Sequence, residues 1–182
     1  MDDIVAAALK KWPNVPHCYG WLALDARGDW YMRDDRIQAA GPFPRVKGSR
    51  IDHLKLKEFI GRNYAADPAG AWFFQNGPQR VYVELEAAPW VWRLQPDPTS
   101  SVVVTSHTGL PAAPAGEAFV DEHGRLFLIS DLGLGIVHTL DMGAASDLVE
   151  RGVWHPQEAA FETLVERYGF LLSPAARAPA QA

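Results

Sequence analysis

The sequence has one cysteine, no long apolar run and no basic tract, and each shortage excludes a class of protein. Cys18 is the single cysteine in 182 residues, so an intramolecular disulfide and a zinc site built only from cysteines are excluded. No stretch approaches the roughly 18 apolar residues that a membrane-spanning helix needs. Lysine and arginine are scattered and the net charge is −5, which disfavours nucleic acid as a partner.

The amino terminus lacks the features of a targeting segment. It reads MDDIVAAALKKW, with acidic residues before a short apolar run, and a secretory signal has a basic segment there instead. We therefore expect a soluble cytoplasmic protein without a membrane partner. The apolar fraction of 48% is enough for a core, and the length corresponds to about one domain, or one domain with a small appendage.

Aromatic residues are what the sequence has in excess, and they concentrate in residues 71–94, AWFFQNGPQRVYVELEAAPWVWRL. Asn76-Gly77 supplies the positive φ angles of a hairpin turn. Residues 80–86 alternate with a period of two, which is typical of a half-buried antiparallel strand. Pro89 marks a second turn, and residues 90–94 then form a third strand. We predict that this β-meander is the central sheet.

Three further elements complete a predicted N-terminal α+β unit over residues 1–98. Residues 2–12 form a short helix with acids at its start and lysines at its end. Residues 19–33 form a hairpin, and residues 49–65 form a helix that begins with a capping box at Ser49. We expect the meander to pair with the hairpin and to be covered by the second helix.

A second α+β unit is predicted over residues 99–172, after a polar linker at residues 95–101. Its predicted elements are strands 102–105, 117–129 (a hairpin) and 134–140, and a helix over 156–168. Residues 141–150 fit either a short helix or a loop. The proline-rich tail 173–182 is predicted to be disordered. The fold class is therefore α+β, with antiparallel meander and hairpin sheets packed with a few helices.

Two predicted hairpin loops share the spacing Asp-x-x-Gly. They are Asp25-Ala-Arg-Gly28 and Asp121-Glu-His-Gly124. The motif is common in hairpin loops, so the repetition is weak evidence of an internal duplication.

Six histidines suggest a metal or general-base site, but their spacing argues against a metal. His17 and Cys18 are neighbours whose side chains point to opposite faces of an extended chain, and no two histidines lie four apart on a predicted helix. We expect no metal and no cofactor. His138 lies on an apolar strand and is either a core residue or, beside Asp131 or Asp141, a general base.

The remaining motifs also favour structural roles. Gly133-x-Gly135 lacks the third glycine and the following helix of a nucleotide loop, which favours a bend or bulge. The serines form no Gly-x-Ser-x-Gly elbow. No motif therefore identifies an activity.

Trp90 and Trp92 are the exception among the seven tryptophans, because they share one strand face. Tyr82 is expected opposite them, alongside Arg80 and Arg93. A partly exposed surface of aromatic and arginine side chains is typical of interaction sites, where these residue types concentrate binding energy. We therefore predict that these five residues form a binding surface.

Residues 56–94 resemble a family of uncharacterised bacterial proteins described as having a domain of unknown function. The most specific part is FQNGPQRVYV at residues 74–83, continued by PWV at residues 89–91. The resemblance implies a bacterial cytoplasmic protein and no activity, so no catalytic residue can be carried over from it.

Three hypotheses for function follow. The first is a non-enzymatic binding or interaction module that uses the aromatic and arginine surface, with a protein or a small molecule as its partner. The second is a small-molecule enzyme, hydrolytic, that uses His138 with Asp131. The third is a homodimer whose aromatic face is buried between two copies.

Overall fold

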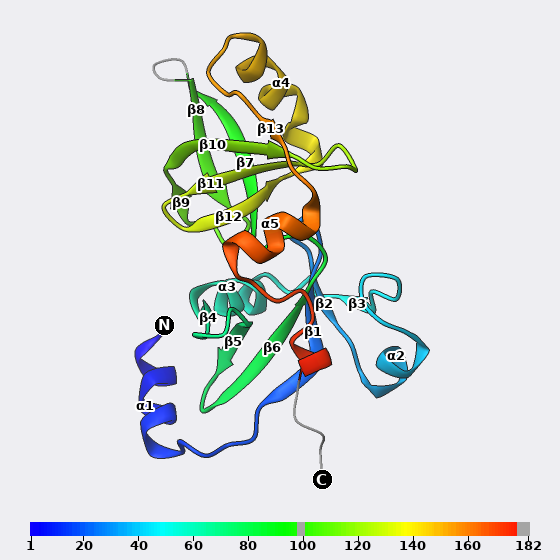
Figure 1. Cartoon of the computed structure of the whole chain (residues 1–182). Coiled ribbons are helices and arrows are strands. Elements are labelled where there is room, and N and C mark those ends of the chain that lie inside the picture. The colour runs from blue at the N-terminus through cyan, green and yellow to red at the C-terminus, as the bar shows by residue number, and fades with distance from the viewer. Residues whose placement is uncertain (98–100, 178–182) are drawn as a thin grey trace. The chain divides into compact units, whose positions relative to one another are not determined.

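The computed structural model describes residues 1–97 and 101–177, and the chain forms two compact units (Figure 1). Of the described residues, unit 1 comprises 1–25, 29–86 and 170–177, whereas unit 2 comprises 26–28, 87–97 and 101–169. The predicted boundary at residue 98 differs from this division, because the strand over residues 90–97 already belongs to the sheet of unit 2. Every helix among the described residues is too short or too polar to cross a bilayer.

Unit 1 is built around a six-stranded sheet with the order β3-β2-β1-β6-β5-β4. Its elements are α1 (Asp3–Lys11), β1 (Cys18–Leu24), β2 (Trp30–Met32), α2 (Asp35–Ala40), β3 (Ser49–Arg50), α3 (Leu54–Arg62), β4 (Tyr64–Ala66), β5 (Trp72–Asn76), β6 (Gln79–Leu85) and the 3-10 helix η2 (Pro174–Arg177). β1 and β6 are parallel neighbours at the centre, and the other pairs are antiparallel. α3 packs against β5, and η2 packs against β1 and β6.

The centre of this sheet follows from the local sequence. Gly77 has a φ of 58°, which a hairpin turn requires, and Asn76 pairs with Gln79 across that turn. β6 was predicted to be half-buried, but Tyr82 to Leu85 are buried on both faces of the sheet. The reason is that β6 lies between β1 and β5 as a central strand.

The predicted capping box at Ser49 is wrong. Ser49 and Arg50 form β3 and pair with β2, so the helix starts five residues later at Leu54. His53 caps α3 instead, because its ring Nδ1 accepts a hydrogen bond from the amide of Leu56 at 3.2 Å. Strand pairing thus prevailed over the local capping signal.

Unit 2 is built around a seven-stranded sheet with the order β13-β10-β11-β12-β7-β8-β9. Its elements are β7 (Trp90–Asp97), β8 (Ser101–Ser106), β9 (Pro111–Ala112), β10 (Pro114–Val120), β11 (Leu126–Ser130), β12 (Gly133–Val137), η1 (Thr139–Asp141), α4 (Met142–Glu150), β13 (Gln157–Glu158) and α5 (Phe161–Tyr168). The third strand of the predicted meander is β7, and it pairs with β8 and β12 rather than with β6.

The structure corrects two predictions for the C-terminal part of the chain. α5 is shorter than the predicted helix over 156–168, because Gln157 and Glu158 pair with β10. Residues 174–177 of the predicted disordered tail form η2, and residues 178–182 lie outside the described residues. The fold class itself is α+β with mostly antiparallel sheets, as predicted.

The two sheets share one strand order. In unit 1 the first strand, β1, is the parallel neighbour of the last strand of the set, β6; in unit 2, β7 is the parallel neighbour of β12 in the same way. The strands that follow each first strand continue the sheet to one side, and those that precede each last strand continue it to the other. β13 is an additional edge strand in unit 2.

Three hairpin loops have the same Asp-x-x-Gly structure. They begin at Asp25, Asp67 and Asp121, and their glycines have φ of 80° (Gly28), 80° (Gly70) and 72° (Gly124). In each loop Oδ1 of the aspartate accepts a hydrogen bond from the amide four residues later, at 3.0, 3.0 and 2.9 Å. Because Asp67 links β4 to β5 and Asp121 links β10 to β11, these two loops occupy equivalent places in the two sheets.

Candidate functional site

The predicted binding surface is divided between the two units. Arg80 and Tyr82 lie on β6 of unit 1, whereas Trp90, Trp92 and Arg93 lie on β7 of unit 2. The cause is the segment Ala87–Pro89, after which the chain enters a different sheet. These five residues therefore do not lie on one strand face.

Trp90 and Trp92 are interior rather than partly exposed. Their exposed fractions are 5% and 0%, and their rings lie 6.1 Å apart and nearly parallel. The indole N–H of Trp90 donates to the carbonyl of Leu132 at 2.8 Å, and that of Trp92 donates to Leu128 at 3.1 Å. Buried indoles with satisfied N–H groups act as core residues.

The glycine pair after Asp131 is explained by the same packing. A Cβ on Gly135 would lie only 2.3 Å from the indole of Trp92, so only glycine fits beside that ring. This close approach supports the structural interpretation of Gly133-x-Gly135 over the nucleotide-binding one.

Arg93 is half-exposed and bound to Asp141. Its Nε lies 2.6 Å from Oδ2 of Asp141, which also accepts the amide of Leu94 at 3.0 Å. Burial alone would raise the pKa of Asp141, but the hydrogen bonds from Arg93 and from the Leu94 amide outweigh it, so that pKa is lowered. Arg93 thus ties η1 to β7 of unit 2.

His138 and Asp131, the alternative catalytic pair, are not brought together. Asp131 precedes β12 and His138 follows it, so the five residues of that strand put roughly 16 Å between them. His138 is buried and its Nδ1 accepts the amide of Leu140 at 3.0 Å, as the cap of η1. Asp131 is exposed and accepts the amide of Ala113 at 2.8 Å. We therefore do not retain the hydrolytic mechanism through this pair.

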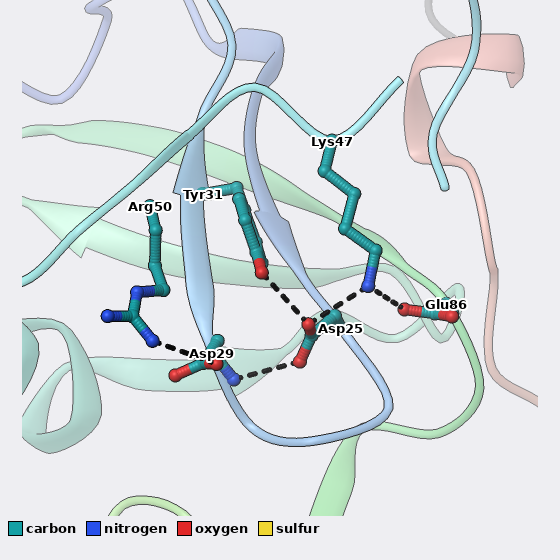
Figure 2. A network of polar contacts seen from close by, with 6 residues as sticks. All are labelled: Asp25, Asp29, Tyr31, Lys47, Arg50 and Glu86. Atoms are coloured by element: carbon teal, nitrogen blue, oxygen red, sulfur yellow. Dashed lines mark hydrogen bonds and ion pairs between the residues drawn. The ribbon is translucent and has the colours of Figure 1, made fainter. Parts of the chain in front are cut away.

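A charge network around the buried Asp25 of unit 1 was not predicted (Figure 2). The side chain of Asp25 accepts the amide of Asp29 at 3.0 Å, the hydroxyl of Tyr31 at 3.1 Å and the ammonium of Lys47 at 3.0 Å. Lys47 also donates to Glu86 at 2.9 Å. The network fastens the connector before β3 to the β1–β2 hairpin.

The electrostatics of this network favour a structural role. Burial lowers the pKa of Lys47, but its hydrogen bonds to Glu86 and Asp25 outweigh that effect and the pKa is raised. Burial and the nearby Asp25 raise the pKa of Tyr31. At neutral pH the amine is therefore charged and the phenol is neutral, so neither group is an activated nucleophile or base.

Of the five residues of the predicted surface, Tyr82 lines a pocket of unit 1, and the other four lie outside its lining. We call it the tyrosine pocket, and it is about 170 Å³ in volume. It is lined by Tyr19, Asp67, Tyr82, Leu171, Pro174 and Arg177, with two alanines. The rings of Tyr19 and Tyr82 are stacked 4.6 Å apart at an angle of 5°. Tyr82 is buried and Tyr19 is half-buried, so Tyr19 offers the accessible ring.

Hydrogen bonds fix the walls of the tyrosine pocket. The hydroxyl of Tyr82 donates to Oδ2 of Asp67 at 3.0 Å, and Oδ1 of Asp67 accepts the amides of Ala69 and Ala71. Burial raises the pKa of Tyr82 and the bond to Asp67 raises it further, against an opposing effect of Arg80. The phenol therefore remains a hydrogen-bond donor at neutral pH.

The returning end of the chain supplies the remaining wall of the tyrosine pocket. The amide of Leu171 donates to the carbonyl of Gly70 at 3.0 Å, and the amide of Ala175 donates to Glu84 at 3.1 Å. These bonds place η2 and its exposed Arg177 at the pocket. Arg80 lies outside the lining, with its guanidinium 4.4 Å from the centre of the Phe73 ring.

Unit 2 has a second hollow, the acidic pocket, of about 440 Å³. It is lined by Val120, Asp121, Glu122, Glu158, Ala159 and Ala160. Two of its three carboxylates have partners, because Asp121 binds Arg125 at 2.6 Å and Glu122 accepts the amide of Phe161 at 2.8 Å. Asp121, Glu122 and His123 are close enough to hold a cation together, but these internal bonds account for the two acids without one.

Sequence reasoning named Tyr82 but missed Tyr19, Asp67 and Arg177. Asp67-Pro-Ala-Gly70 has the same spacing as the two loops that were recognised, so that signal was available. No local pattern marks Tyr19 or Arg177, because β1 and η2 reach the pocket only through tertiary packing.

These features define an α+β protein of two sheets, each with a hollow beside an Asp-x-x-Gly loop. The chain belongs to the family described as "Protein of unknown function (DUF2946)", whose model matches residues 1–175. This match confirms the resemblance to a family of unknown function. A solved structure of a DUF1285 family protein from Shewanella baltica OS155 is similar, with 14% identity, a TM-score of 0.47, and coverage of 70% of this chain and 91% of that chain. No curated protein matches.

Proposed function

We propose that the protein is a non-enzymatic binding module that holds a small ligand, or one side chain of a partner, in the tyrosine pocket of unit 1. The observation that carries the proposal is the stacked pair of Tyr19 and Tyr82, in which the buried ring supports a half-buried one. A preorganised aromatic wall binds at low entropic cost. The volume of about 170 Å³ suits an occupant no larger than a single ring or a short branched chain.

The charged groups beside the pocket support binding rather than catalysis. The phenol of Tyr82 is neutral at neutral pH and already donates to Asp67. Two backbone amides hold the other oxygen of Asp67 in place. A carboxylate engaged in this way is a fixed recognition group, whereas a general base needs a free path to a substrate proton.

The setting of this module is also a proposal. The family resemblance and the single cysteine support a bacterial cytoplasmic protein. A homodimer is the alternative use of its aromatic residues, and a sizing column run across a range of concentrations tests it directly.

A fragment screen by NMR on the intact chain tests the binding function. We expect ring-sized fragments to shift the amide signals of Ala69, Ala71 and Leu171, which lie around the pocket. Tyr19→Ala should weaken the binding of these fragments about fivefold, because stacking on one aromatic ring contributes on the order of 1 kcal/mol. Trp21→Ala is the matched control, since Trp21 is an exposed aromatic on the same strand and outside the pocket. Fragments that shift only other signals would contradict the proposal.

A further inference from the structure

The walls of the tyrosine pocket carry one negative and one positive side chain that do not pair with each other. Asp67 and Arg177 both line the hollow, and within residues 1–97 and 101–177 they form no ion pair. The hydrogen bonds of Asp67 come from Ala69, Ala71 and Tyr82, all of which are neutral donors. Arg177 has no hydrogen-bond partner among the described residues. The pocket therefore presents two opposite charges to its contents.

Each charge has capacity left for a ligand. A carboxylate accepts about four hydrogen bonds, and that of Asp67 accepts three. The guanidinium of Arg177 has its full set of donors and is exposed, which suits a planar carboxylate. An anion alone would bind Arg177 but face Asp67, and a cation alone would bind Asp67 but face Arg177.

The remaining lining is apolar and aromatic. Tyr19 offers a ring, while Leu171 and Pro174 offer aliphatic surface. A ligand that uses every wall has an ammonium group, a carboxylate and an apolar side chain within about 170 Å³. In a peptide of several residues the terminal ammonium and carboxylate are too far apart for both to lie inside such a volume. A single free amino acid carries both charges on one carbon and fits.

We propose that the tyrosine pocket binds a free α-amino acid with an apolar side chain. The ligand carboxylate binds Arg177, its ammonium binds Asp67, and its side chain lies against Tyr19 and Leu171. This inference rests on the proposed binding function of the same pocket and adds the chemical class of the ligand. No bond is made or broken in the complex.

The test compares the binding of leucine with that of two smaller analogues, each of which lacks one of its charged groups. The standard amino acids are first screened by NMR against the intact chain, and leucine is then compared with 4-methylpentanoic acid, which lacks the ammonium, and 3-methylbutylamine, which lacks the carboxylate. We expect each analogue to bind at least tenfold more weakly than leucine, because each loses one charged hydrogen bond.

Two substitutions assign the charges. Arg177→Gln should lower the affinity for leucine to the affinity that the unchanged protein has for 3-methylbutylamine. Asp67→Asn should lower it to the affinity that the unchanged protein has for 4-methylpentanoic acid. Asp67→Asn keeps the oxygen that accepts the loop amides, and Arg177 is exposed, so both variants should fold. Arg151→Gln is the control, since Arg151 is an exposed arginine of unit 2.

The outcomes separate this inference from the proposed function. If ring-sized fragments occupy the pocket but no amino acid does, or if the analogues match leucine, the ligand class is wrong and the binding function stands. If neither fragments nor amino acids shift the signals of Ala69, Ala71 and Leu171, both proposals fail.

Discussion

The two units share a strand order but line their hollows with opposite chemistry. In unit 1 the loop of Asp67 lies beside two tyrosines and an arginine, whereas in unit 2 the loop of Asp121 lies beside two glutamates. The backbone of the two loops is the same. Strand order therefore places a hollow at this loop, and the side chains contributed by other segments decide what the hollow can bind.

The aspartates of these equivalent loops differ in the partner of their second oxygen. Oδ2 of Asp121 is held by the guanidinium of Arg125 at 2.6 Å, whereas Oδ2 of Asp67 is held by the phenol of Tyr82 at 3.0 Å. Burial raises the pKa of Asp121, but hydrogen bonds from Arg125 outweigh this and the pKa is lowered. Unit 2 thus pairs its loop carboxylate with a guanidinium, whereas the hydrogen bonds to Asp67 in the described part of unit 1 come from neutral donors.

The largest expected effect concerns the tryptophans of unit 2, which lie in its core. Trp92→Ala should lower the free energy of unfolding by about 3–5 kcal/mol, because it removes a fully buried ring and leaves a cavity. Urea denaturation followed by circular dichroism measures this loss. Trp21→Ala in unit 1 is the control and should cost less than about 1 kcal/mol, since that ring is partly exposed. Equal losses would contradict the assignment of Trp92 to the core.

The second effect is a sensitivity of unit 2 to acid. Burial lowers the pKa of His107 to about 3, from 6.5. Between pH 6.5 and 3, His107 is therefore protonated in the unfolded chain but neutral in the folded chain. Its contribution to the free energy of unfolding is complete above pH 6.5 and is lost as the pH falls toward 3. At about pH 4.5 the loss should be on the order of 2–3 kcal/mol.

Hydrogen exchange of the amides of β7 and β8, measured between pH 7 and 4, follows that loss. His107→Asn keeps an acceptor for the amide of Val91, which Nδ1 of His107 now binds at 3.3 Å, and should remove the histidine's share of the pH dependence. Unit 1 has the opposite tendency at Glu84, whose pKa is raised by burial, because acid relieves the cost of its buried charge. An unchanged pH profile in His107→Asn would rule out His107 as the source.

A third, smaller effect is expected at the charge network of unit 1. Lys47→Met leaves the buried Asp25 without its ammonium partner and should lower the free energy of unfolding by about 1–2 kcal/mol. This loss is smaller than that expected for a fully buried pair, because the Lys47 side chain is 37% exposed. Arg50→Met, which removes exposed ion pairs with Asp29 at 3.6 Å and with Asp52 at 2.9 Å, should change the free energy of unfolding little. If the two substitutions lower the free energy of unfolding equally, the network does not stabilise the attachment of the connector to the β1–β2 hairpin.

The smallest effect on stability is expected at Arg177. Arg177→Gln should change the free energy of unfolding by less than about 0.5 kcal/mol, because the exposed side chain has no partner among the described residues. The same substitution should weaken amino acid binding at least tenfold. Thermal unfolding and NMR titration of one sample measure both quantities, and a large loss of stability would show that Arg177 has a structural role.

Local patterns predicted much of the fold. The turn at Gly77 and the Asp-x-x-Gly loops need only a few residues to form, so they were recognisable from the chain alone, although the turn residues are Gly77 and Pro78 rather than Asn76 and Gly77. The prediction of a capping box at Ser49 failed because that segment pairs with a distant strand, β2. The prediction of a single binding surface failed for a similar reason, since Tyr82 and Trp90 are eight positions apart and yet belong to different sheets.

The sequence by itself determined the α+β class, the main hairpins and the exclusion of disulfides, because period, turn residues and cysteine count are properties of short segments or of composition. Only the tertiary structure decided which aromatic side chains are interior and which line a hollow. The tyrosine pocket joins β1, a loop after β4, β6 and η2, which are far apart along the chain. Such a site depends on long-range strand pairing and on the return of the chain to unit 1, and neither is written in a local pattern.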